Sequence, residues 1–421
     1  MALTQVSTGG VKDDAITKAK IPANQIEASE LADNAVDTNA IATDAVTIDK
    51  VADDAVGADQ LASNAVVTAS IADNAITQAK INVPLSNRNL IINGAMQVAQ
   101  RGTSSTANDY LIDRFRFSYG GTDEAPTQAQ VDVASGTTPY TLGFKKALKI
   151  TNGNQTSGAG AADFLEFYQY LEDQDISNSG WNFKSSSSYI TISYWVKSSV
   201  AQKFTGFLYT NQAGAGDSYM YSYQIDDGSG GNLTADTWTK ITHSIAGNSN
   251  LTFNNDNTRG LAVGFYMFEG TDYSTSSHTE NTWAAWNSSN KIKDMTSTWY
   301  TTNDATFEIT GVQLEVGSVA TDFEHRSFEE EEHRCFRYYQ NFDNSIVYAG
   351  FSDGNTSSRL SLNFQYMRAT RDIPTISYNN QTTGSAIAAR YTKKMAGIVV
   401  NTTNSRGGTG YITDILIDSE L

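Results

Sequence analysis

The sequence has little of several features that define common classes of protein. Only one cysteine, Cys335, occurs in 421 residues, which excludes a framework of intrachain disulfides. No stretch approaches the roughly 18 consecutive apolar residues of a membrane-spanning helix, and the start, MALTQVSTGG, lacks the basic and apolar regions of a secretory signal. Lys and Arg number 29 against 46 Asp and Glu. The net charge of −17 argues against nucleic acid and against membrane insertion.

Aromatic residues are absent from the beginning of the chain. Every Phe, Trp and Tyr lies at or after Tyr110. A chain without large apolar side chains cannot build an ordinary globular core, so residues before and after this point follow different physical rules. The boundary between the two parts is expected between about residues 82 and 110.

The first part is a ten-residue repeat over residues 11–82. An aliphatic residue recurs at every fifth position, and Asp or Asn occupies the fourth position of each decad. The expected core positions of this repeat are Ile16, Ile21, Ile26, Leu31, Val36, Ile41, Val46, Val51, Val56, Leu61, Val66, Ile71 and Ile76. The expected turn positions are Asp14, Asn24, Asn34, Asp44, Asp54, Asn64 and Asn74.

The spacing of the repeat excludes a simple helix or strand. At about 100° per residue, successive apolar positions drift around a helix and form no stripe. Five is odd, so in one continuous strand they would alternate between faces. The chain must therefore turn within each decad, which Asp and Asn favour because their side chains bond the backbone two residues on.

Three structures for residues 11–82 remain open. A single-chain solenoid would resemble pentapeptide repeats, although those place a small residue two positions before the large one, and here Ala lies one position before it. An acidic disordered linker does not require the strict spacing. Several chains wound about one axis are favoured, because two aliphatic residues per decad cannot offset about 1–2 kcal/mol of backbone entropy per residue in a single chain.

The second part reads as antiparallel β-structure. Short alternating apolar runs separated by turn residues occupy 189–199, 203–210, 238–245, 260–268 and 305–317, which predicts a sandwich or jelly roll over 83–326. Ser327 and Glu330 form a capping-box pattern, so a linking helix is expected over 327–342. Strand-like stretches then predict a small β domain over 343–421.

Residues with catalytic or metal-binding chemistry are few. His325 and His333 beside Glu331 and Glu332 are better explained as a solvated helix face than as a metal site, and Cys335 as a packing residue. No hydrolase, metalloprotease or nucleotide-binding motif occurs. Acidic pairs for glycoside cleavage exist, but they are common in so acidic a chain. We therefore expect no enzyme activity and no cofactor.

The most informative candidate binding segment is the long polar stretch 272–300. Tyr273, Trp283, Trp286, Trp299 and Tyr300 lie in it, and aromatic rings stack on the C–H faces of sugars. The alternative is that these rings hold the segment onto the sandwich. A competing glycan site lies in the C-terminal β domain, where the candidates are Tyr348, Tyr366, Tyr378, Tyr391 and Tyr411.

Several stretches resemble the tail fibre proteins of tailed bacteriophages. They are the ADNAV decads, the entry NRNLIINGAMQVAQRGTS (87–104) and the exit FEITGVQLEVGSVATDFEHRSFEEEEHRCFRYYQ (307–340). The second part is also similar to jelly-roll carbohydrate-binding modules, which often begin NLxxNGxFE. Here Gln97 replaces the Glu of that pattern, which puts the structural calcium of those modules in doubt.

The tail-fibre resemblance implies a fold and a role. It implies a mainly β homotrimer in which residues 1–10 attach to the phage tail or an adaptor protein, 11–82 form the shaft, and the β domains recognise a host surface polysaccharide. The protein would be made in the host cytoplasm and reside in the virion. Alternatives are a polysaccharide-cleaving tailspike, a structural collar of the virion, and an adhesin.

Overall fold

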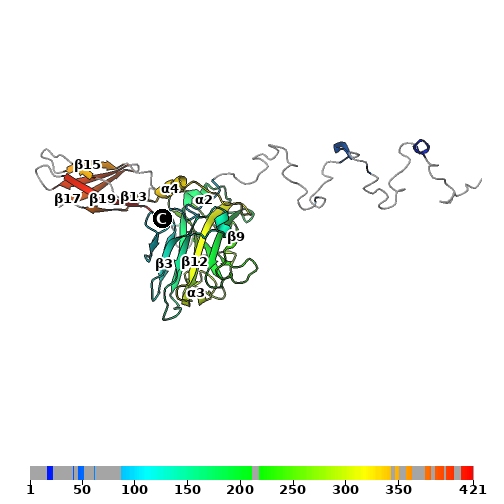
Figure 1. Cartoon of the computed structure of the whole chain (residues 1–421), viewed down its shortest axis with the longest axis horizontal. Helices are drawn as coiled ribbons and strands as arrows, with labels where there is room; N and C mark the ends of the chain where they lie inside the picture. The colour runs from blue at the N-terminus through cyan, green and yellow to red at the C-terminus, as the bar shows by residue number, and fades with distance from the viewer. Residues whose placement is uncertain are drawn as a thin grey trace, which may run out of the picture. The chain divides into compact units, whose positions relative to one another are not determined.

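The computed structural model describes residues 87–210 and 218–342, together with parts of the two ends of the chain. These parts are residues 17–21, 41, 46–51 and 61 near the N-terminus, and 347–349, 357–362, 375–380, 385–392, 395–402 and 409–420 near the C-terminus. The chain divides into two units, Met1–Asn82 and Val83–Leu421 (Figure 1).

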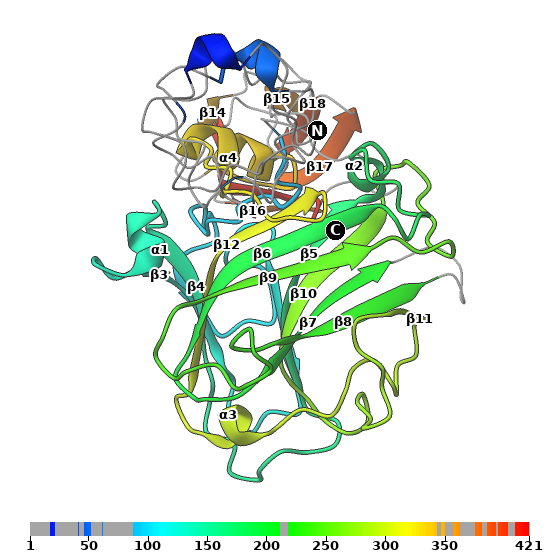
Figure 2. The same cartoon turned by 90° about the vertical axis from the view of Figure 1, so that its right-hand side faces the viewer.

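Two six-stranded antiparallel sheets form a sandwich, as the sequence predicts. The first sheet contains β1 (Ser104–Ser105), β3 (Thr127–Asp132), β4 (Lys146–Thr151), β12 (Thr306–Val316), β6 (Tyr189–Ser198) and β9 (Thr239–Ala246) in spatial order. The second contains β11 (Trp283–Ala285), β8 (Tyr219–Ile225), β7 (Phe204–Thr210), β10 (Arg259–Glu269), β5 (Phe164–Glu172) and β2 (Arg116–Gly120). Figure 2 shows β5, β10, β7 and β8 side by side.

The core lies between the inner faces of the two sheets. The Phe167 and Phe265 rings of the second sheet stack with centroids 4.8 Å apart, and Phe307 of the first sheet packs across the interior against Phe204 at 4.9 Å. The hydroxyls of Tyr194 and Tyr223 hydrogen-bond to each other at 3.1 Å and join the sheets. Burial of these rings, together with the aliphatic residues around them, stabilises the sandwich.

Short helices lie in the loops of the sandwich. They are α1 (Thr138–Thr141), α2 (Asp173–Ser177) and α3 (Thr298–Thr301). Figures 1 and 2 show α2 and α3 at opposite ends of the sandwich. Among the described residues no helix is long and apolar enough to cross a membrane.

The linking helix α4 is shorter than the sequence predicts. It spans Phe328–Phe336, and the hydroxyl of Ser327 accepts a hydrogen bond from the backbone N–H of Glu330 at 3.2 Å, which is the predicted cap. The prediction of helix up to residue 342 is wrong. Residues Tyr339–Phe342 form β13, because their backbone groups pair with the C-terminal strand β19 (Thr409–Asp418). Long-range pairing overrides a local helical pattern here.

The C-terminal region consists of β-strands, and its first strand, β13, pairs with its last, β19. The remaining strands are β14 (Val347–Ala349), β15 (Ser357–Leu362), β16 (Thr375–Asn380), β17 (Ser385–Thr392) and β18 (Met395–Thr402). β13, β14 and β16 pair with β19, while β15 and β17 flank β18. The chain end returns to the sandwich, because Arg101 forms ion pairs with Asp418 at 3.1 Å and with Glu420 at 3.5 Å.

In the described parts of the N-terminal unit, the same local structure recurs at the same position of the ten-residue repeat. A 3-10 turn, η2 (Lys18–Lys20) in the first decad and η4 (Ile48–Lys50) in the fourth, occupies the same three positions of each. Five expected core positions are described, and all are exposed in the single chain: Ile21 39%, Ile41 46%, Val46 59%, Val51 40% and Leu61 45%. The other expected core positions and all seven Asp and Asn turn positions lie outside the described residues.

Candidate functional site

The outer face of the second sheet carries aromatic side chains. Along β5, Leu165 and Phe167 point into the core, while Tyr168 and Tyr170 alternate with them on the outer face. Outward positions of an antiparallel sheet are normally polar, so two neighbouring tyrosines there mark a surface that differs from an ordinary solvated face. Their rings lie 5.2 Å apart.

Small residues on the central strand β10 turn this face into a trough. Ala262 lies between Tyr209 of β7 and Tyr170 of β5, and Gly264 lies between Phe207 and Tyr168. A Cβ atom on Gly264 would lie 2.3 Å from Cζ of Phe207, so only glycine allows the ring to lean across the strand. The small residues of β10 therefore form a depression along the middle of the outer face, with aromatic side chains of β5 and β7 on its two sides.

A cavity of about 160 Å³ occupies the trough. Phe207 and Tyr266 stack at 4.5 Å in its floor, and Tyr209 and Trp286 lie 6.0 Å apart at its rim, with Trp286 45% exposed. We call this surface the aromatic groove and define it by its lining residues, which are Glu166, Tyr168, Tyr170, Phe207, Tyr209, Met220, Ala262, Tyr266, Trp286 and Lys291.

Glu166 and Lys291 line the aromatic groove, and Glu269 is bound to Lys291. The ammonium of Lys291 donates to both oxygens of Glu269, at 3.1 and 3.3 Å, and lies 4.2 Å from the centroid of the Tyr273 ring. Burial raises the pKa of Glu166 and of Glu269, and nearby Lys291 opposes the rise in both. Both groups therefore hold a proton more readily than a carboxyl in water.

The raised pKa of Glu166 predicts a pH dependence of stability. The folded state holds this proton more tightly than the unfolded chain, so the contribution is complete below the unfolded pKa and is lost as pH rises through the folded pKa. The melting temperature of Glu166→Gln is expected to fall less than that of the wild type between about pH 5 and about pH 8. Calorimetry measures it, with the exposed Glu329→Gln as control. Equal slopes for all three proteins would contradict the assignment.

Three of the five aromatic residues expected to bind glycan are partly accessible. Trp286 stands at the rim of the aromatic groove, and half-buried Tyr273 packs edge-to-face on Phe164 at 6.0 Å. Trp283 is half-buried on β11; its indole N–H donates to the carbonyl of Ala246 at 2.9 Å. Trp286 therefore offers the most open ring of the three.

The other two belong to the core. Trp299 and Tyr300, on α3, are both 0% exposed. The indole N–H of Trp299 donates to the carbonyl of Thr306 at 3.0 Å, and the Tyr300 hydroxyl donates to Asp163 at 3.1 Å. Tyr300 also stacks on Phe268 at 4.3 Å. Neither ring reaches a ligand at the surface, so we leave both out of the candidate site.

A serine, a histidine and an asparagine form a hydrogen-bonded chain beside the aromatic groove. Nε2 of His278 lies 2.7 Å from the Ser222 hydroxyl, and Nδ1 lies 3.0 Å from the side-chain oxygen of Asn290. This arrangement resembles a catalytic serine that is activated by a histidine, which a third side chain orients. Ser222, however, is 1% exposed, so a substrate carbonyl cannot reach it. The chain instead fastens the loop after β10 to β8.

Of the two histidines near α4, His325 packs against aromatic rings, whereas His333 is exposed. The His325 ring lies 5.1 Å from Phe144 and 4.9 Å from Phe323, and its Nε2–H donates to the carbonyl of Leu142 at 2.8 Å. The rings of Phe144, Phe323, His325 and Trp195 line a cavity of about 270 Å³ on the first sheet. The first three of these rings pack against one another. Within the described residues no group of three His, Cys, Asp or Glu side chains could hold a metal ion. Cys335 is fully buried, in keeping with a packing role.

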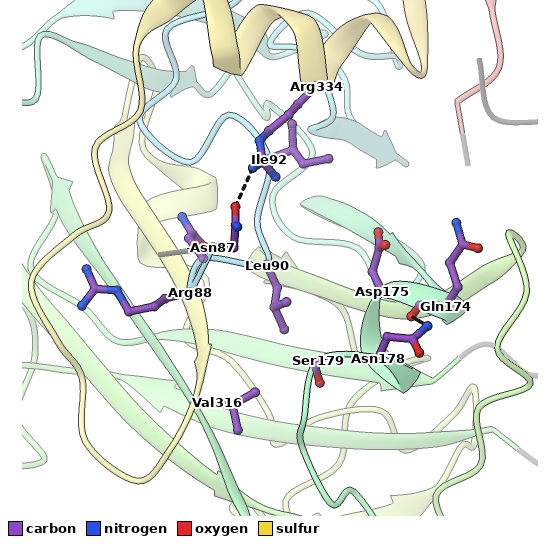
Figure 3. Close-up of a pocket in the computed structure, with 11 residues that line it drawn as sticks. Asn87, Arg88, Leu90, Ile92, Gln174, Asp175, Asn178, Ser179, Val316 and Arg334 are labelled. Atoms are coloured by element: carbon purple, nitrogen blue, oxygen red, sulfur yellow. Dashed lines mark hydrogen bonds between the residues drawn. The ribbon is translucent and has the colours of Figure 1, made fainter. Parts of the chain in front are cut away.

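A further cavity, of about 390 Å³, adjoins the first described residues of the sandwich (Figure 3). Arg334 of α4 donates to the side-chain oxygen of Asn87 at 3.0 Å on one side, and Asp175 of α2 lies on the other. Leu90 and Val316 supply apolar surface. No aromatic ring lines this cavity, so it lacks the flat apolar face on which a sugar ring stacks. The aromatic groove is the better candidate.

Comparisons with known proteins give weak likenesses. No family model and no curated protein matches the chain. A putative sugar-binding protein from Bacteroides thetaiotaomicron is similar at 12% identity and a TM-score of 0.27, over 55% of this chain and 100% of that one. A family 11 carbohydrate-binding module of a Clostridium thermocellum cellulase is similar at 12% identity and a TM-score of 0.25, over 53% and 98%.

A third structure is an arabinose-bound α-L-arabinofuranosidase, at 11% identity and a TM-score of 0.30. The match covers 54% of this chain and 26% of that enzyme, so this chain spans about a quarter of its length. At these identities and TM-scores the likenesses carry no conclusion about ligand or activity. The assignment of the aromatic groove depends on its own geometry.

The groove tyrosines were missed at the level of sequence, although a signal was present. The stretch FLEFYQYLE (164–172) alternates like a strand, yet both of its faces carry aromatic residues. Such double aromatic alternation distinguishes a binding face from a solvated one. The tyrosines considered in the C-terminal domain lie where the structure describes no side chains.

Proposed function

We propose that this protein is a receptor-binding tail fibre of a tailed bacteriophage that recognises a host surface polysaccharide through the aromatic groove. The observation that carries the glycan part is the trough of Ala262 and Gly264 between rings on β5 and β7. A polysaccharide chain is a flat ribbon with apolar C–H faces and polar edges. An open trough with aromatic walls and a polar end is suited to it.

The proposed action is binding without covalent chemistry. A glycosidase needs two carboxyl groups whose environments push their pKa values apart, so that one donates a proton while the other is ionised. Burial pushes the pKa of Glu166 and of Glu269 in the same direction. Ser222 is 1% exposed, so its hydroxyl is not accessible as a nucleophile. Binding alone remains the better explanation of the site.

The fibre part of the proposal depends on the N-terminal unit. The exposure of all five described aliphatic core positions in a single chain supports an association in which other copies cover them. We propose a homotrimer whose shaft is formed by residues 11–82, attached to the tail or to an adaptor by residues 1–10. Three groove sites on one fibre, and several fibres on one virion, convert weak contacts into stable attachment.

Removing rim aromatics is expected to abolish most of the binding. Trp286→Ala and Tyr209→Ala should each weaken binding by about tenfold or more, because stacking and burial of one ring stabilise by about 1–2 kcal/mol. The affinity of the full chain for a panel of purified bacterial surface polysaccharides measures this. Trp238→Ala is the matched control, since half-buried Trp238 lies next to β9 of the opposite sheet. Wild-type affinity in both groove variants would overturn the assignment of the site.

A further inference from the structure

Two guanidinium groups stand at the β2–β5 side of the aromatic groove. Arg116 of β2 lies directly opposite Tyr168 in the strand pairing, so their side chains share the outer face. The guanidinium of Arg259, at the start of β10, lies 4.6 Å from the centroid of the Tyr170 ring. Because the rings of Tyr168 and Tyr170 are 5.2 Å apart, both cations border one aromatic surface.

Within the described part of the chain neither guanidinium has a carboxylate partner. Ion pairs are found at Arg101, Arg326 and Arg337, for example, but at neither Arg116 nor Arg259. The Nε atom of Arg116 is buried and has no hydrogen-bond partner among the described residues. A guanidinium group without a carboxylate partner is stabilised by a ligand that supplies one.

The carboxyl groups on neighbouring positions of β5 form no ion pair with these two cations within the described residues. Glu166 lies two residues before Tyr168 on the outer face of β5, and Arg116 lowers its pKa, but burial dominates and raises that pKa. Glu172 lies opposite Arg259 in the strand pairing and is bound by Arg337. Glu269 is engaged with Lys291 instead. Arg116, Arg259 and Lys291 thus place three cations at the aromatic groove of a chain whose net charge is −17.

We propose that the ligand of the aromatic groove is an acidic polysaccharide, whose sugar carboxylate pairs with Arg116 and Arg259 while its ring lies against Tyr168 and Tyr170. This inference rests on the proposed glycan binding and specifies its chemical class. Guanidinium groups bind carboxylates through paired N–H donors in a fixed fork, which gives both affinity and orientation. A neutral glycan would leave both guanidinium groups without a carboxylate partner.

The test compares one polymer with and without its charge. The full chain is assayed by calorimetry against polygalacturonate, alginate and hyaluronate, and against the same polymers after chemical reduction of their carboxyl groups. At least one acidic polymer is expected to bind about tenfold or more tightly than its reduced form, with an affinity that falls as salt is added. Arg116→Gln with Arg259→Gln should remove that preference and leave binding of the reduced polymer unchanged. Lys240→Gln, at an exposed position of β9 on the other sheet, is the control for net charge.

The outcomes separate this inference from the proposed function. If the reduced polymers bind as tightly as the acidic ones and Trp286→Ala weakens both, glycan binding stands and the acidic ligand class is wrong. If the acidic preference survives the double substitution, or is lost equally in Lys240→Gln, Arg116 and Arg259 are not its source. If Trp286→Ala changes the binding of no polysaccharide in the panel, the groove itself is excluded and the inference falls with it.

Discussion

Replacing Trp299 by alanine is expected to lower the free energy of unfolding of the sandwich by about 3–5 kcal/mol. The indole is 0% exposed, packs edge-on to Phe204 at 6.1 Å and donates to the carbonyl of Thr306. Its removal leaves a cavity at the α3 end of the sandwich and removes one of the two hydrogen bonds that the Thr306 carbonyl accepts, the other coming from the backbone N–H of Ser199 at 3.0 Å. Both losses destabilise the folded state, and the cavity dominates. Calorimetric melting of the full chain measures the loss.

Trp286→Ala is the matched control for this prediction. The same residue type is removed thirteen positions earlier in the same segment, but the Trp286 ring is 45% exposed. Its removal should change the melting temperature little, since substitutions at exposed positions alter stability by about 0.5 kcal/mol or less. Opposite behaviour is therefore expected, with stability lost in one variant and glycan binding lost in the other. Similar melting temperatures for the two variants would contradict the placement of Trp299.

Replacing Ile41, Val51 and Leu61 together by aspartate is expected to convert a trimer into single chains. In one chain these side chains are 40–46% exposed, and in the proposed trimer other copies would bury them. Three buried charges per chain about a common axis would oppose association by several kcal/mol each. The wild type should have about three times the 45.7 kDa mass of one chain in light scattering, and the variant about that mass itself.

The control for the shaft prediction adds the same kind of charge at polar positions. Thr17→Asp with Thr47→Asp alters exposed residues that precede η2 and η4, and the mass is expected to stay at the wild-type value. A wild-type mass equal to that of one compact chain would contradict the proposed trimeric shaft. The proposed gain from multivalent binding would be lost with it, while the proposed glycan site in the aromatic groove would be unaffected, because all of its lining residues lie in the second unit.

Sequence patterns located the elements of this protein well. The runs at 189–199, 203–210, 238–245, 260–268 and 305–317 correspond to β6, β7, β9, β10 and β12. A period of two and the bounding turn residues are local properties, so they can be read without knowledge of the fold. The cap at Ser327 was likewise correct, because it needs only residues within one helical turn.

The same patterns could not determine which aromatic residues face a ligand. Trp299 and Tyr300 lie in a polar stretch like Trp286, yet α3 directs both into the core while Trp286 remains at the rim. That difference depends on packing between segments far apart in the sequence, such as the contact of Tyr300 with Asp163. The strand at 339–342 follows the same rule, since its partner β19 lies near the chain end.

Taken alone, the chain's amino-acid order determined its ten-residue period, its β-rich second part and the chemistry available to it, because these follow from composition and local spacing. Only the folded sandwich decided that Tyr168, Tyr170 and Tyr209 share one open face with Arg116 and Arg259. The reason is physical: strand pairing across β2, β5, β10 and β7 brings together residues that no local pattern connects.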